Sequence, residues 1–387
     1  MRTLEASSSC IVWNFIFIIW MVIIISSLVG SSTSSVCEFE GMFNFGDSNS
    51  DTGGFYSAFP PQVSPYGKTY FKKPVGRASD GRLIVDFLAQ ALGLPFLSPY
   101  LQSIGSDYRH GANFANSAST VIPPTASLFV SGLSPFYLGI QLRQMEQFKA
   151  RVGDLFNQQK IRFGANLPSP DIFGKSIYTI YIGQNDFTSK LAYGGINALR
   201  GYIPQIISQI DATIKELYLQ GGRTFLVFNL GPIGCYPGYM VEIYHESSDV
   251  DEFGCVVSHN NVVYEYNKLL QETLTQTRGS LKGASLIYVD THSTLLKLFQ
   301  YPTTYGFKYS TKACCGHGGG DHNFNPKILC GNLAASACHD PQNYVSWDGI
   351  HLTEAANKIV TRTILNGSIF HPPFPLHIHC DLEPIDD

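Results

Sequence analysis

The stretch MFNFGDSNSDTGG, residues 42 to 54, joins an apolar, strand-like run to an abrupt polar turn. The run is rich in strand formers and breaks at Gly46, after which Asp47 and Ser48 open a series of small polar residues. A buried strand that ends in Gly-Asp-Ser can be an ordinary turn. It can also hold a serine at the rim of a sheet, where a substrate reaches it.

Strand-like runs alternate with helical patterns along the rest of the chain. In order, these segments are 42–46, 81–94, 111–118, a long helical stretch at 141–159, 176–183, a helix at 202–221, 224–231, a helix at 260–274, 285–290 and a last helix at 352–365. The alternation predicts an α/β fold, a three-layer sandwich whose central, mostly parallel sheet has helices on both faces. The strands are continuous apolar runs, as a sheet covered on both sides requires.

The amino-terminal region predicts a leader followed by one domain. Residues 11–30 are almost wholly apolar, follow Arg2 and run into the small-residue stretch SSTSS before Cys37. We expect residues 1–36 to be a secretory signal peptide, with an uncleaved membrane anchor as the alternative. No second segment of this kind follows, so we expect no stable membrane span in residues 37–387. No internal repeat or low-complexity linker divides these residues, so we expect them to form a single domain.

Cysteine usage supports the prediction of export. Of nine cysteines, Cys10 lies in the leader, which leaves an even number for disulfides. We expect the Gly- and Cys-rich segment at about 302–346 to be a disulfide-tied insertion near the site. A zinc site is the alternative for these cysteines. The segment lacks repeated C-x-x-C spacing, so we predict that it binds no metal. Asn366 begins an N-glycosylation sequon, Asn-Gly-Ser, compatible with export.

The charge balance excludes a nucleic-acid partner. Charged residues make up 14% of the chain and the formal net charge is −4, so no basic field is present to hold a phosphate backbone. We predict no cofactor, and the sequence leaves the oligomeric state open.

Polar residues follow the predicted strands where ligands of open parallel sheets collect, beyond the carboxyl ends. The first strand ends at Ser48, another ends at Asn185, and Asp348 and His351 lie in the turn before the last helix. A histidine three residues after an aspartate can be oriented by that carboxylate and take a proton from a serine. Taken singly, Ser48 can be a turn residue, and Asn185 and Asp348 can be helix caps.

The order and spelling of the motifs identify a family resemblance. The blocks FNFGDSNSDTGG, GANFANSAS, YIGQND and SWDGIHLTEAAN, with the connecting segments FLVFNLGPIGC and KACCGHGGG, cover the chain from about Cys37 to past Ile364. The chain resembles the plant-type GDSL esterase/lipase family of the SGNH hydrolase superfamily, which implies a flavodoxin-like sheet.

The resemblance also implies the site residues. Ser48 would be the nucleophile, His351 the general base and then acid, and Asp348 the residue that holds the imidazole tautomer. The oxyanion hole would consist of the backbone N–H of Ser48, a backbone N–H at Ala118 and the side-chain amide of Asn185. The family usually has glycine where this chain has Ala118, and the methyl group is a disadvantage if that position needs a positive φ.

The expected function is that of a secreted serine hydrolase that acts in the cell wall or apoplast. It would cleave carboxylic esters, namely acyl or acetyl esters of lipids, cell-wall polysaccharide or phenolics, through an acyl-enzyme. One alternative is a carbohydrate-binding protein that keeps the fold with weak catalysis. Another is a fucosidase-like glycoside hydrolase, although that chemistry usually needs two carboxylates.

Overall fold

The computed structural model describes residues 37–158 and 166–385. The predicted signal peptide, residues 1–36, lies outside these ranges and stays a prediction. Within them, no helix has both the length and the apolar character needed to cross a bilayer.

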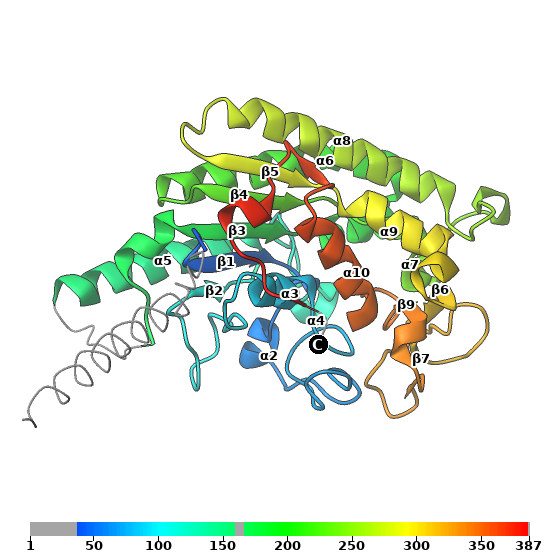
Figure 1. The fold of residues 1–387 in the computed structure, drawn as a ribbon. Coiled ribbons are helices and arrows are strands. Elements are labelled where there is room, and N and C mark those ends of the chain that lie inside the picture. The colour runs from blue at the N-terminus through cyan, green and yellow to red at the C-terminus, as the bar shows by residue number, and fades with distance from the viewer. Residues whose placement is uncertain (1–36, 159–165, 386–387) are drawn as a thin grey trace, which may run out of the picture. The chain divides into compact units, whose positions relative to one another are not determined.

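The centre of the molecule is a six-stranded sheet with the strand order β10-β5-β4-β3-β1-β2 (Figure 1). Its strands are β1 (Gly41–Gly46), β2 (Gly111–Asn113), β3 (Ser176–Tyr181), β4 (Thr224–Phe228), β5 (Ser285–Val289) and β10 (Phe370–His371). All neighbours pair in parallel except β10, which runs antiparallel to β5. This is the flavodoxin-like order, and the predicted fold class is confirmed.

Helices cover both faces of the sheet, as the continuous apolar strands require. The α-helices are α2 (Gly54–Ala58), α3 (Ile84–Ala91), α4 (Leu128–Ser131), α5 (Leu138–Asn157), α6 (Gln184–Leu219), α7 (Pro237–Glu242), α8 (Val257–Arg278), α9 (Thr291–Gln300), α10 (Glu354–Leu365) and α11 (Leu376–His379). On one face α6 packs against α5 and α8, and on the other α10 packs against α3 and α9 (Figure 1). Short 3₁₀ turns, η1 to η5, occupy Pro170–Gly174, Ile233–Cys235, Ser247–Asp249, Pro302–Tyr305 and Pro341–Asn343.

Several helices differ from the sequence-based expectation: the short α2, α4, α7 and α11 were not expected, and two longer helices differ as well. The helix expected at 202–221 already begins at Gln184, and a non-helical Gly195 interrupts it with a φ of 69°. Asn185 is therefore inside the helix and does not cap it, because the cap residue is Gly183. Helix α9 was not expected either. Its first turn is capped by the Asp290 carboxylate, which accepts the backbone N–H of Ser293.

The segment 302–346 stays outside the central sheet and forms two small ones. Strand β6 (Tyr309–Ala313) pairs with β9 (Tyr344–Ser346), and β7 (Cys315–Gly316) pairs with β8 (Ser336–Ala337). Two disulfides, Cys314–Cys338 and Cys315–Cys330, lie within it.

All eight cysteines of the described residues form disulfides, as predicted from their number. The other two pairs are Cys235–Cys255 and Cys37–Cys380. The last pair connects the beginning and the end of the described chain.

Candidate active site

Close packing against β3 explains why the apolar run ends at Gly46. A side chain there would place its Cβ 2.3 Å from the backbone oxygen of Tyr181 on β3, so only glycine fits. The buried Gln141 of α5 accepts the Gly46 N–H at 2.9 Å and donates to its carbonyl at 2.8 Å. The strand end is therefore fixed, and the next two residues, Asp47 and Ser48, leave the sheet at its carboxyl edge.

Ser48 and the distant pair Asp348 and His351 meet at this edge. The Ser48 Oγ lies 2.7 Å from the His351 Nε2, and the His351 Nδ1 lies 2.8 Å from the Asp348 Oδ2. With its Nδ1 proton donated to the carboxylate, the imidazole presents a lone pair at Nε2 to the serine hydroxyl. Ser48 is 7% exposed and the His351 side chain 15%, so both groups are largely buried but keep some contact with solvent.

The Asp348 carboxylate is held by four hydrogen bonds. Its Oδ1 accepts the backbone N–H groups of Ile350 and His351 at 3.0 and 2.9 Å. Its Oδ2 accepts the imidazole and, at 3.0 Å, the hydroxyl of Tyr66. The preceding Trp347 is fully buried against the disulfides of the 302–346 segment, so the whole turn is held rigidly.

Asp348 and His351 shift the pKa of one another. Burial raises the pKa of Asp348, but the positive His351 and the hydrogen bonds to the carboxylate outweigh burial, so the net shift is downward. Burial lowers the pKa of His351, but Asp348 and the charge of Asp47 outweigh burial, so the net shift is upward.

Asp47 is a second carboxylate beside the imidazole. It is 1% exposed, and burial raises its pKa to about 6. Its Oδ1 accepts the backbone N–H and the side-chain amide of Asn49, whereas its Oδ2 has no hydrogen-bond partner among the described residues. A carboxylate in this position favours a positive charge on His351.

The segment with Ala118 is attached to the first turn of α6. The Asn185 side-chain amide donates to the backbone oxygen of Ser119 at 2.8 Å. The neighbouring carboxylate, Asp186, accepts the N–H groups of Val121 and Ile122 at 2.7 and 3.0 Å. Ala118 has a φ of 60°, so this position does require the left-handed backbone that favours glycine.

Two backbone donors at the site are unoccupied. Neither the N–H of Ser48 nor that of Ala118 donates to an acceptor in the ranges 37–158 and 166–385. Backbone N–H groups without an acceptor are the kind of donor that a developing oxyanion needs. Asn366, the sixth residue predicted from the sequence, follows α10 and is exposed.

Several residues that shape the site were not predicted from the sequence. Tyr66, from the loop after α2, gives no motif signal, because its contact with Asp348 depends on folding. Gln141 likewise resembles any other polar residue of an amphipathic helix. Asp47 could have been noticed as a charged residue between an apolar strand and the serine.

Comparison with known proteins identifies the family. The GDSL-like lipase/acylhydrolase family matches residues 42–364. A GDSL esterase/lipase of Arabidopsis thaliana is 59% identical over 368 residues, which are 93% of this chain and 96% of that protein. The α-L-fucosidase 3 of Arabidopsis thaliana is 41% identical over 355 residues, 89% of this chain and 95% of that one. An esterase of Hevea brasiliensis is 39% identical over 357 residues, 90% of each. The chain therefore belongs to the GDSL-like lipase/acylhydrolase family and is a carboxylic ester hydrolase.

Proposed function

We propose that the chain hydrolyses esters through an acyl-enzyme on Ser48, with His351 as general base and then acid and Asp348 as its orienting partner. The continuous hydrogen-bonded line from Ser48 to Asp348, with distances of 2.7 and 2.8 Å, is the observation that supports these roles most directly.

The steps follow from this geometry. The Ser48 oxygen attacks the ester carbonyl while the His351 Nε2 takes its proton, and the carbonyl oxygen becomes an oxyanion. The imidazolium then protonates the leaving alcohol, which departs and leaves an acyl ester on Ser48. Water then attacks the acyl carbonyl while the same nitrogen takes its proton. The bond between the acyl carbon and the Ser48 Oγ breaks, the imidazolium returns the proton to Ser48, and the carboxylic acid leaves.

The nucleophile is tested by Ser48→Ala with Ser50→Ala as the matched control. Ser50 lies in the same turn, and its buried hydroxyl has no hydrogen-bond partner among the described residues. We expect Ser48→Ala to lower kcat for short p-nitrophenyl esters by roughly 10⁶-fold and Ser50→Ala to leave it near wild type. An organophosphonate should label the wild type at Ser48. Full activity of Ser48→Ala would refute the role, and an unlabelled, inactive wild type would favour the carbohydrate-binding alternative.

We propose that the N–H groups of Ser48 and Ala118 and the Asn185 amide stabilise the oxyanion. One amide hydrogen of Asn185 is used by Ser119, which leaves the second for the substrate. Asn185→Ala should lower kcat by about 10²- to 10³-fold, whereas Asn197→Ala, exposed on the same helix, should not. Unchanged turnover of Asn185→Ala would remove Asn185 from the hole.

We propose a secreted protein in which residues 1–36 are the leader, residues 37–387 form one domain, and 302–346 is a disulfide-tied insertion beside the site. Four disulfides suit an oxidising compartment, and the exposed Asn366 can accept a glycan. The proposed substrates are acyl or acetyl esters of lipids, cell-wall polysaccharide or phenolics. A panel of esters with graded acyl chains and acetylated sugars distinguishes among them.

Glycoside hydrolysis is a second candidate because one relative is named an α-L-fucosidase. The carboxylates near Ser48 do not favour it, since Asp348 is saturated by hydrogen bonds and Asp47 is buried. Fucose released from a synthetic fucoside by both the wild type and Ser48→Ala would support this second activity.

A further inference from the structure

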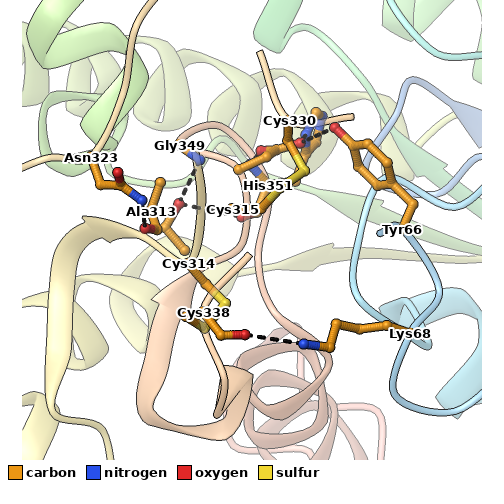
Figure 2. The surroundings of a disulfide bond; sticks show 12 residues. Tyr66, Lys68, Ala313, Cys314, Cys315, Asn323, Cys330, Cys338, Gly349 and His351 are labelled. Carbon is orange, nitrogen blue, oxygen red and sulfur yellow. Dashed lines mark hydrogen bonds and ion pairs between the residues drawn. A yellow bond between two sulfur atoms is a disulfide. The ribbon is translucent and has the colours of Figure 1, made fainter. Parts of the chain in front are cut away.

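Among the described residues, Tyr66 and His351 are the two side chains that hydrogen-bond the Asp348 carboxylate. The Tyr66 O–H donates to the Asp348 Oδ2 at 3.0 Å, the same oxygen that accepts the imidazole. Figure 2 shows Tyr66 directed towards the segment that carries His351, beside the Cys315–Cys330 disulfide. The two residues that meet, Tyr66 and Asp348, are 282 positions apart in the chain.

Independent contacts hold Tyr66 in this place. Its ring packs edge-on against Trp347, with the ring centroids 6.0 Å apart. The next residue, Gly67, donates its N–H to the Ser79 carbonyl at 3.0 Å. Lys68 donates from Nζ to the Cys338 carbonyl at 3.0 Å, so the loop is attached to the disulfide-tied segment (Figure 2).

We propose that Tyr66 is a positioning residue that fixes the Asp348 carboxylate and disperses its charge, and so sets the basicity of His351. The inference rests on the proposed roles of Ser48, His351 and Asp348. Burial and the nearby Asp348 charge raise the pKa of the Tyr66 phenol, so it keeps its proton and remains a donor throughout the working range.

The direction of the effect follows from electrostatics. A donor on Oδ2 withdraws negative charge from the side of the carboxylate that faces the imidazolium. Without it, Asp348 stabilises the imidazolium more strongly, and the pKa of His351 rises. The other titratable groups facing this pair are Asp47, which acts on His351, and Tyr56, which faces Asp348. Both stay in place when only the Tyr66 hydroxyl is removed.

The test compares Tyr66→Phe with Tyr178→Phe. Both changes keep the ring and remove one hydroxyl; that of Tyr178 donates to the Phe173 carbonyl at 2.9 Å, at the amino-terminal edge of the sheet. In Tyr66→Phe we expect the acid limb of kcat/KM to move up by about half a pH unit. We also expect kcat on the plateau to fall about 3- to 10-fold with KM unchanged. Tyr178→Phe should show neither change.

A profile of Tyr66→Phe that coincides with wild type, or a lower kcat with an unshifted acid limb, would overturn the inference and leave a packing role. The His351 pKa measured by NMR in Ser48→Ala, with and without Tyr66→Phe, gives the same test without activity. Its rise supports the inference, and its constancy contradicts it. The two proposals fail separately. An active Ser48→Ala variant, or a wild type that the organophosphonate does not label, contradicts the role of Ser48 as nucleophile. Labelling of Ser48 together with an unshifted acid limb in Tyr66→Phe contradicts only the positioning role of Tyr66.

Discussion

Ala118 adopts a backbone conformation that alanine disfavours. Its φ of 60° is left-handed, a conformation shared in the described chain by just two other non-glycine residues, Lys72 and Asn323. The conformation costs alanine about 1–2 kcal/mol. Its N–H donates to no acceptor in the described residues, which leaves it available for the proposed oxyanion hole.

Ala118→Gly should therefore stabilise the protein. Relief of the left-handed strain exceeds the greater freedom of glycine in the unfolded chain, about 0.4–1 kcal/mol, so we expect a net gain of about 0.5–1 kcal/mol. Urea unfolding measures it. Ala334→Gly, at an exposed position with an ordinary φ, is the control and should lose stability. A loss at both positions would show that Ala118 is not strained.

The pH profile depends on the environment of His351. Since Asp348 and Asp47 together raise its pKa above 6.5, and only the neutral imidazole accepts a proton, activity should rise with pH through a midpoint above 6.5. The dependence of kcat/KM on pH measures this midpoint. Asp47→Asn removes one of the two negative charges while an oxygen remains to accept from Asn49, so its midpoint should be lower. A flat profile from pH 5 to 8 would contradict the role of His351.

At the scale of elements, the turn that carries Asp348 and His351 depends on the disulfide-tied segment. The N–H groups of Cys314 and Cys315 donate to the carbonyls of Ser346 and Trp347 at 3.1 and 2.6 Å. Cys314 and the first residue of β7 thus hold the chain just before Asp348, and the turn after β1 brings Ser48 to the His351 ring. The α6 start supports the opposite side of the site in the same way, through Asn185 and Asp186.

Removal of the Cys315–Cys330 disulfide should lower activity as well as stability. The bond closes a loop of 15 residues, which stabilises by about 3 kcal/mol. We expect Cys315→Ala/Cys330→Ala to lose about that much and to lower kcat per folded molecule several-fold, because the turn beside it becomes less ordered. The control is Cys37→Ala/Cys380→Ala, which should keep kcat. The concentration of active sites is measured by titration of labelled Ser48, and kcat is calculated per active site. Equal kcat values in both variants would show that the turn needs no support from this disulfide.

At the scale of the whole molecule, the Cys37–Cys380 disulfide connects residues 343 positions apart. Two further interactions reinforce this contact. The Glu38 N–H donates to the His379 carbonyl at 2.9 Å, and the His379 Nδ1 lies 2.8 Å from the Glu38 Oε2. Closing so long a loop restricts the unfolded chain strongly, which stabilises by about 5 kcal/mol in the chain-entropy account.

Cys37→Ala/Cys380→Ala should therefore lower the free energy of unfolding by up to about 5 kcal/mol, more than loss of the 15-residue loop. Chemical denaturation under non-reducing conditions compares the two variants. A smaller loss for the long loop would mean that the ends stay together through Glu38 and His379 without the covalent bond.

Much of the architecture could be predicted because its signals are local. The strands at 42–46, 176–183 and 224–231 are continuous apolar runs, and the Asp348–His351 spacing lies within one turn. The start of α6 could not be placed, because Gly195 interrupts the helix while neighbouring elements hold both halves. Helix α9 carries local signals of its own, the Asp290 cap and the apolar Leu295, Leu298 and Phe299, so it could have been predicted from the sequence.

The sequence by itself determined the sheet, the family and the residue types at the site, since each depends on periodicity or on motifs read along the chain. The tertiary structure alone decided which cysteines pair, that Ala118 is left-handed and that Tyr66 reaches Asp348. The physical reason is distance along the chain: these contacts join segments that are tens to hundreds of residues apart. Their geometry exists only after the sheet has brought its carboxyl edge and the disulfide-tied segment together.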